Sequence, residues 1–127
     1  MDTAIWLRQI REVLEEFSSA EFQERVWVKG LGPEVSSYEE AVCRLFDDLG
    51  FDRLIDVEWR QAGLSEQQVV TLGDFRDKLL EFGGDISEIP HPRDVMRQPK
   101  LEQIRMCASR AAQALSSHPG LFAGAES

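Results

Sequence analysis

Apolar residues recur at intervals of three and four along four segments of this chain, and this spacing is typical of amphipathic helices. We predict a first helix over residues 2–18, a second over 37–49, a third over 65–82 and a last one that begins near Pro99. No strand-like alternation extends beyond three or four residues. The sequence therefore predicts an all-α, single-domain bundle of four main helices around one core.

The ends of two of these helices carry specific signals. Residues 37–40 (Ser-Tyr-Glu-Glu) and 65–68 (Ser-Glu-Gln-Gln) form capping boxes, in which the serine hydroxyl accepts a hydrogen bond from the amide three residues later. Gly50 follows the second helix, at the position where a left-handed conformation favours glycine. We expect the third helix to end at Gly83 and Gly84.

Prolines and glycines indicate where the connections between helices lie. All five prolines fall outside the predicted helix interiors. We expect residues 26–33 to form a loop with an extended start at 26–28, and residues 51–64 to form a connector with one short turn. Residues 85–98 contain two prolines and predict a long, mostly irregular, proline-punctuated connection before the last helix.

The length of 127 residues suits one domain, which we place at residues 1–118, followed by a flexible C-terminal tail at 119–127. A chain of this size buries about two-thirds of its unfolded surface, so it needs neither a metal nor a disulfide to fold. Cys43 and Cys107 fall within predicted helices beside core positions, which indicates reduced, half-buried thiols.

The charge balance is strongly acidic, with a formal net charge of -9. Nucleic-acid phosphates and anionic membrane surfaces repel such a chain at long range, whereas a basic protein is steered toward it. The charge is densest between residues 37 and 58, where seven acids face two bases. We therefore predict a protein partner, and neither a nucleic-acid partner nor a membrane.

Targeting signals are missing from the residues that would carry them. The first residues show no basic stretch followed by an apolar one, so we expect no secretion signal. No apolar run approaches the roughly 20 residues that span a bilayer. These observations predict a cytoplasmic protein.

Residue types that catalyse reactions do not occur in catalytic patterns. His91 and His118 lie in proline-bearing loops without a cysteine or carboxylate at ligand spacing, and no serine lies in a Gly-x-Ser-x-Gly elbow. We therefore predict no catalytic residue, no metal and no cofactor, and hence no enzyme. A metal-dependent all-α enzyme stays open as an alternative, in which acids of the second helix region would converge with acids from the polar faces of the first helix: Asp47, Asp48 or Asp52 with Glu12, Glu15 or Glu16.

Three tryptophans offer large contact surfaces. Trp6 lies on the apolar stripe of the first helix and is predicted to be structural. Trp27 and Trp59 lie in predicted connectors, where each either covers the core from outside or anchors a partner, as interface tryptophans do. Nearby bases can equally pair with the acids within the chain: Arg25, Lys29, Arg53 and Arg60.

One pair of motifs resembles a known group of proteins. Residues 21–28 (Glu-Phe-Gln-Glu-Arg-Val-Trp-Val) are followed by a predicted helix that ends in Leu-Phe-Asp-Asp at 45–48. This order resembles a group of small bacterial helical proteins in which Phe/Tyr-Gln-x-x-Val-Trp precedes such a helix. Many of them are uncharacterised, and similar small acidic proteins serve as immunity proteins in contact-dependent inhibition and other polymorphic toxin systems. The resemblance covers residues 18–49 and departs after Asp48, where related sequences tend to have threonine or serine and this chain has Leu49.

The resemblance implies a non-catalytic, immunity-type protein that neutralises a cognate toxin, plausibly a basic nuclease domain, by stoichiometric occlusion. An acidic face would imitate nucleic-acid phosphates, and two tryptophans would anchor the partner. An alternative function is a cytoplasmic helical adaptor or homo-oligomerising module, for which an exposed apolar patch would be the sign. The residues predicted to bind the partner are Asp47, Asp48, Asp52, Asp56, Trp27 and Trp59.

Overall fold

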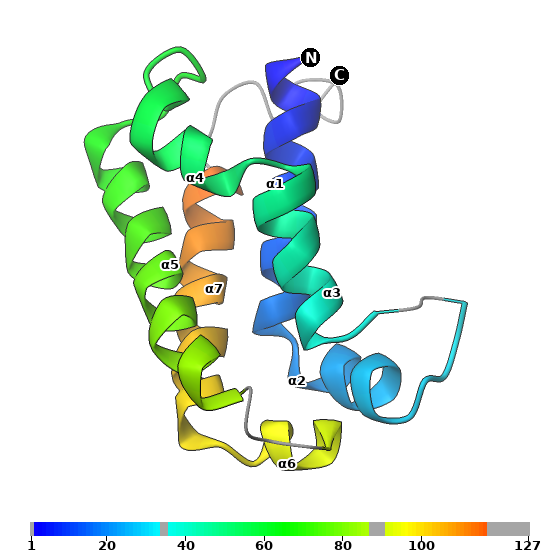
Figure 1. Ribbon diagram of the computed structural model, residues 1–127. Coiled ribbons are helices and arrows are strands. Elements are labelled where there is room, and N and C mark those ends of the chain that lie inside the picture. The colour runs from blue at the N-terminus through cyan, green and yellow to red at the C-terminus, as the bar shows by residue number, and fades with distance from the viewer. Residues whose placement is uncertain (1, 34–35, 87–90, 117–127) are drawn as a thin grey trace.

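The computed structural model describes residues 2–33, 36–86 and 91–116, and every regular element in these ranges is helical, with no strand (Figure 1). Seven α-helices occur there, interrupted by three π-helical segments that we label η1 to η3. In chain order the elements are α1 (Thr3–Ser18), α2 (Ala20–Phe22), η1 (Gln23–Val28), α3 (Tyr38–Cys43), η2 (Arg44–Asp48), α4 (Phe51–Arg53), η3 (Leu54–Glu58), α5 (Glu66–Ile86), α6 (Pro92–Met96) and α7 (Pro99–Ser116).

The three longest helices, α1, α5 and α7, form the main packing unit, with α7 in contact with both of the others (Figure 1). The apolar stripe of α1 is buried as its spacing predicts, and it includes the predicted structural Trp6. Small residues on α7 let the backbones approach closely, since Ala108 and Ala111 are fully buried. The core is therefore built from helical faces that the 3.6-residue period already indicates.

The predicted helix caps are confirmed. The Ser37 hydroxyl accepts a hydrogen bond from the Glu40 amide at 3.1 Å. At the start of α5 the box is reciprocal, because Ser65 Oγ accepts from the Gln68 amide at 3.1 Å and Gln68 Oε1 accepts from the Ser65 amide at 2.7 Å. Gly50 has a φ of 65°, the left-handed conformation expected of it. Local capping thus fixes where α3 and α5 begin.

The extended start predicted at residues 26–28 is wrong, because these residues belong to η1. The Lys29 amide donates to the Glu24 carbonyl, five residues earlier, at 3.1 Å. Val26 and Trp27 are buried in the core from this helical segment. Burial of both side chains on one side of a helix overrides the strand preference of a Val-Trp-Val sequence.

The connector predicted at residues 51–64 is also mostly helical, since α4 and η3 occupy residues 51–58. Phe51 and Leu54 are fully buried and Ile55 is nearly so. These three residues are spaced three and one apart, so a single helical turn places them together against the core. Eight residues are too few for periodicity to reveal such a helix.

Two predictions for the C-terminal part of the chain also differ from the structure. Helix α5 continues through Gly83 and Gly84 to Ile86, and α6 occupies residues 92–96 within the predicted irregular connection. Each glycine costs a helix about 1 kcal/mol relative to alanine, which Phe82, buried just before them, helps to offset. Residues 87–90 and the predicted tail at 119–127 lie outside the described residues.

Two glycines give a matched test of this backbone. Gly50→Ala should lower the free energy of unfolding by about 1–2 kcal/mol, because an L-residue is strained at a φ of 65°. Gly73→Ala should raise it by about 0.5–1 kcal/mol, because Gly73 lies inside α5 and a Cβ there meets no atom within 4 Å. Urea unfolding measures both changes, and shifts of the same sign in the two variants would contradict the backbone description.

Candidate functional site

The predicted acidic residues lie on the exposed surface that runs from η2 to η3. Asp47 and Asp48 end η2 and are exposed, and Asp52 and Asp56 lie in α4 and η3 and are also exposed. The structure brings Asp52 and Asp56 together, because Arg76 of α5 donates from Nη1 to Asp52 Oδ1 at 2.9 Å and to Asp56 Oδ1 at 3.0 Å. We call these four acids the acidic face.

The Arg76 contact divides the acidic face into two parts. Partial burial by itself lowers the pKa of Arg76, but the hydrogen bonds and charges of Asp52 and Asp56 outweigh it and leave the pKa raised. Arg76 therefore stays cationic and partly neutralises that pair. In the part of the chain that the structure describes, Asp47 and Asp48 form no ion pair, so they carry the larger uncompensated charge. Arg76 was not among the bases predicted to pair with these acids, and Arg53 pairs with Glu58 instead.

The two tryptophans predicted as possible anchors differ in exposure. Trp27 is only 6% exposed, and its indole N–H donates to Glu16 Oε1 at 2.9 Å. Its ring also meets the Phe17 ring edge-on, which favours the core-covering alternative for this residue. Trp59 is partly buried against the core, and the Arg60 guanidinium lies 4.8 Å from its ring centroid. Of the two, Trp59 is the one with surface left for a partner.

An apolar groove lies beside the acidic face, between α3–η2 and α5. Its volume is about 680 Å³. Tyr38 forms part of its buried floor and meets the Phe82 ring edge-on across the two helices, with ring centroids 5.6 Å apart. Leu80 also lines the groove, and its side chain is 68% exposed to solvent. The lining residues are Tyr38, Glu39, Val42, Cys43, Phe46, Asp52, Leu79 and Leu80.

Sequence reasoning missed this groove, although one signal for it is present. Leu79 belongs to the apolar stripe of α5, and Leu80 immediately follows it. Adjacent residues on a helix point about 100° apart, so Leu80 points away from the centre of that stripe. A leucine just off the stripe therefore indicates an apolar surface outside the core.

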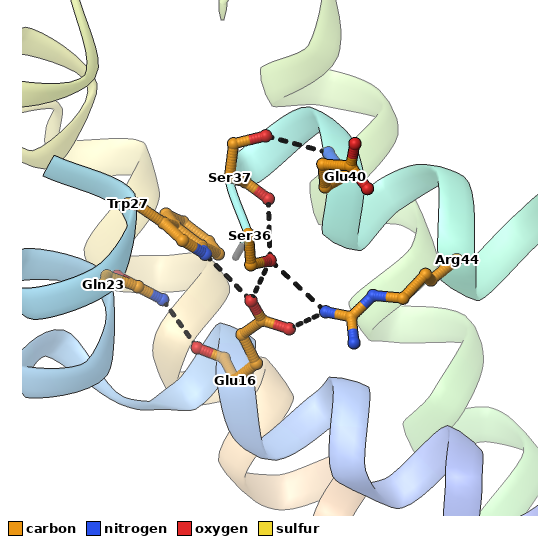
Figure 2. Close-up of polar contacts among 7 residues, drawn as sticks. All are labelled: Glu16, Gln23, Trp27, Ser36, Ser37, Glu40 and Arg44. Carbon is orange, nitrogen blue, oxygen red and sulfur yellow. Dashed lines mark hydrogen bonds and ion pairs between the residues drawn. The ribbon is translucent and has the colours of Figure 1, made fainter. Parts of the chain in front are cut away.

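A buried carboxylate on α1 organises the polar contacts behind the site (Figure 2). Glu16 is 7% exposed, and its Oε1 accepts from Trp27 Nε1 of η1 and from the Ser36 hydroxyl. Its Oε2 accepts from Arg44 Nη2 of η2, and its backbone carbonyl accepts from Gln23 Nε2 at 3.0 Å. One side chain thus joins α1, η1, the segment before α3, and η2. The sequence placed Glu16 on a polar face, so its burial is a correction.

A second cavity of about 560 Å³ opens beside Glu16 and is lined by several other acids. Within residues 2–33, 36–86 and 91–116, no group of three or more histidine, cysteine, aspartate or glutamate side chains is placed to hold a metal ion. The cavity residues are Glu12, Glu15, Glu16, Ser19, Glu21, Phe22, Ser36 and Arg44.

Within the described residues, no helix combines the length and apolarity needed to cross a membrane.

Comparison with known proteins adds no relative. No protein-family model, no curated protein and no solved structure matches the chain. The likeness to immunity proteins therefore rests on the two sequence motifs alone, and a function has to be argued from the surface of this molecule.

The Glu16 network gives a stability prediction. Glu16→Gln keeps the side-chain shape but replaces an acceptor with an NH₂ group, which then faces a donor from Trp27, Ser36 or Arg44. We expect the free energy of unfolding to fall by about 1–3 kcal/mol in urea titrations, the cost of an unsatisfied buried donor. Glu15→Gln is the matched control, because Glu15 is exposed and its side chain forms an i,i+4 ion pair with Arg11 at the surface, so its loss should cost under about 0.5 kcal/mol. Equal effects in the two variants would refute the network's role.

Tyr38, the only tyrosine, reports on the groove floor. Burial raises its pKa from the ordinary 10.0 to about 12, because the phenolate is poorly solvated there. The stabilising effect of the neutral phenol is complete below pH 10 and is lost as the pH rises toward 12. In a spectrophotometric titration the native protein should show no phenolate near pH 10, whereas the urea-unfolded chain should. A native midpoint near 10 would mean that the floor is open to water.

Proposed function

We propose that this protein is a non-catalytic, immunity-type binding protein that neutralises a basic cognate toxin domain by stoichiometric occlusion. The observation that carries the proposal is a pair of exposed carboxylates, Asp47 and Asp48, free of ion pairs within the described chain and next in sequence to the groove residue Phe46. Negative charge beside an open apolar surface complements a basic protein and steers its approach.

In this proposal the acidic face occupies the basic cleft that the toxin would use for its own anionic substrate. Asp47 and Asp48 contribute most of the attraction, because Arg76 already compensates part of the charge of Asp52 and Asp56. Trp59 lies close in sequence to this face and acts as an anchor at its edge. In this proposal the protein works in the cytoplasm as a single-domain bundle of four main helices, and it binds neither nucleic acid nor membrane.

A second candidate function is that of a helical adaptor or homo-oligomerising module. The observation that favours it is the apolar groove itself, with Leu80 exposed at its edge. Apolar surface of this kind is more common at protein interfaces than on isolated monomers. The two candidates differ in the role of charge, since self-association brings like charges together whereas a basic partner does not.

A pull-down from the native cell lysate tests the first candidate. Wild-type protein should capture a basic partner in stoichiometric amount at low salt and less of it at high salt. Asp47→Asn with Asp48→Asn should reduce the capture by about tenfold or more at low salt, as expected when two charge contacts are removed. Asp52 and Asp56 are left unchanged, so that Arg76 keeps both of its partners.

The matched control removes two exposed acids that do not line the groove, Glu12 and Asp74, as Glu12→Gln with Asp74→Asn. This control changes the net charge by the same amount and should retain the partner. A partner lost equally in both variants would reduce the effect to overall charge. If the amount of captured partner does not change with salt or in either variant, the adaptor or oligomer candidate is favoured instead.

A further inference from the structure

We infer that the groove between α3–η2 and α5 is the docking site for an amphipathic segment of the partner, which places apolar side chains in the groove and lysine or arginine side chains against its acidic rim. The inference rests on the proposed function and deepens it, because it names the surface and the chemistry of the element that binds there. An amphipathic helix laid into an apolar groove is a recurrent mode of peptide recognition.

The apolar part of the groove is large enough for such a segment. Val42 and Phe46 line one side, and Leu79 and Leu80 line the other. A volume of about 680 Å³ lies within the range of surface sites that bury several side-chain-sized groups. Leu80 is 68% exposed, so covering it removes apolar surface from water without any rearrangement of the fold.

The rim of the groove carries only negative charge among its described lining residues. Glu39 lies at the start of α3, and Asp52 lies in α4. Asp47 and Asp48 follow Phe46 of the lining and extend the negative charge along the same segment. An apolar floor flanked by carboxylates is complementary to a helix with an apolar stripe and basic flanks.

The charge also decides between a partner and a second copy of this chain. In a two-fold contact the same surface meets itself, so the acids at and beside the rim would lie against the same acidic surface of the second copy: Glu39, Asp47, Asp48 and Asp52. The whole chain carries a net charge of -9, which adds repulsion between copies. A basic segment of another protein gains attraction from the same charges, and it is therefore the occupant.

Synthetic peptides test the groove directly. The probe is a helical leucine–lysine peptide with its leucines on one stripe, and its controls are a peptide of the same composition without the stripe and a leucine–glutamate counterpart. Cys43 lines the groove and is exposed, not half-buried as the sequence predicts, so its alkylation rate reports occupancy. Cys107 on α7 is half-buried and does not line the groove, which makes it the internal reference. Titration calorimetry gives the dissociation constants.

We expect the striped leucine–lysine peptide to protect Cys43 and to bind more tightly than either control peptide. Leu80→Gln should weaken its binding about tenfold, which corresponds to one apolar anchor. Val70→Gln is the matched control, since Val70 is also exposed on α5 but does not line the groove, and it should leave binding unchanged. Both substitutions are at exposed positions, so the fold is retained.

Three results would overturn the inference. One is protection of Cys43 by the striped peptide that is no greater than by the unstriped one. Another is equal weakening by Leu80→Gln and Val70→Gln. The third is protection of Cys43 that grows with protein concentration in the absence of peptide, which would identify a second copy as the occupant.

The groove and the proposed function can fail separately. A basic partner that is lost in the Asp47→Asn, Asp48→Asn pull-down but retained by Leu80→Gln would leave the function standing and remove the groove. A striped peptide that seats in the groove, together with no stoichiometric basic partner in the lysate, would keep the groove and remove the immunity function.

Discussion

The arrangement of η1, α3 and η2 against α1 depends on one buried carboxylate, that of Glu16. Burying the charge of Glu16 is costly unless it is paired and hydrogen-bonded, and here an indole N–H, a hydroxyl and a guanidinium meet its two oxygens (Figure 2). The three donors come from η1, from the segment before α3, and from η2. Because all of them must stay in place to satisfy the carboxylate, Glu16 fixes how these segments lie on the end of α1.

Glu16 also affects the groove, because the segments that it holds include η2, which forms one wall of the groove together with α3. The Trp6 indole N–H donates to the Leu49 carbonyl at 2.6 Å and holds the other end of the same wall to α1. Arg76 connects the opposite wall, α5, to the acidic face through Asp52 and Asp56. These polar contacts therefore hold the two walls of the groove, α3–η2 and α5, in place on either side of its apolar surface.

The sequence predicts the parts of this structure that depend on local chemistry. The serine caps of α3 and α5, the left-handed Gly50 and the apolar stripe of α1 all follow from rules that act within a few residues. The structure differs from the prediction at residues 26–28 and 51–58, which are helical, because burial against distant helices decides their conformation. Glu16 could not be placed for the same reason, since its donors lie up to 28 residues away along the chain.

The candidate site shows the same division. The acidic face is visible as a local excess of aspartate, and its exposure follows from its charge. Its pairing with Arg76 and its position beside a groove depend on how α5 lies against α3–η2, which no local pattern encodes. The burial of Trp27 and the partial exposure of Trp59 likewise reflect tertiary contacts.

Hydrogen exchange on wild-type protein and on Glu16→Gln tests most directly whether one carboxylate positions the groove wall. In Glu16→Gln, exchange in η1 and in α3–η2 should accelerate more than in α5 and α7, because only the former segments are held by Glu16, whereas the amides of α5 and α7 accelerate only by the loss of global stability. Unchanged exchange in η1 and α3–η2, or an equal acceleration throughout the chain, would contradict this role of Glu16.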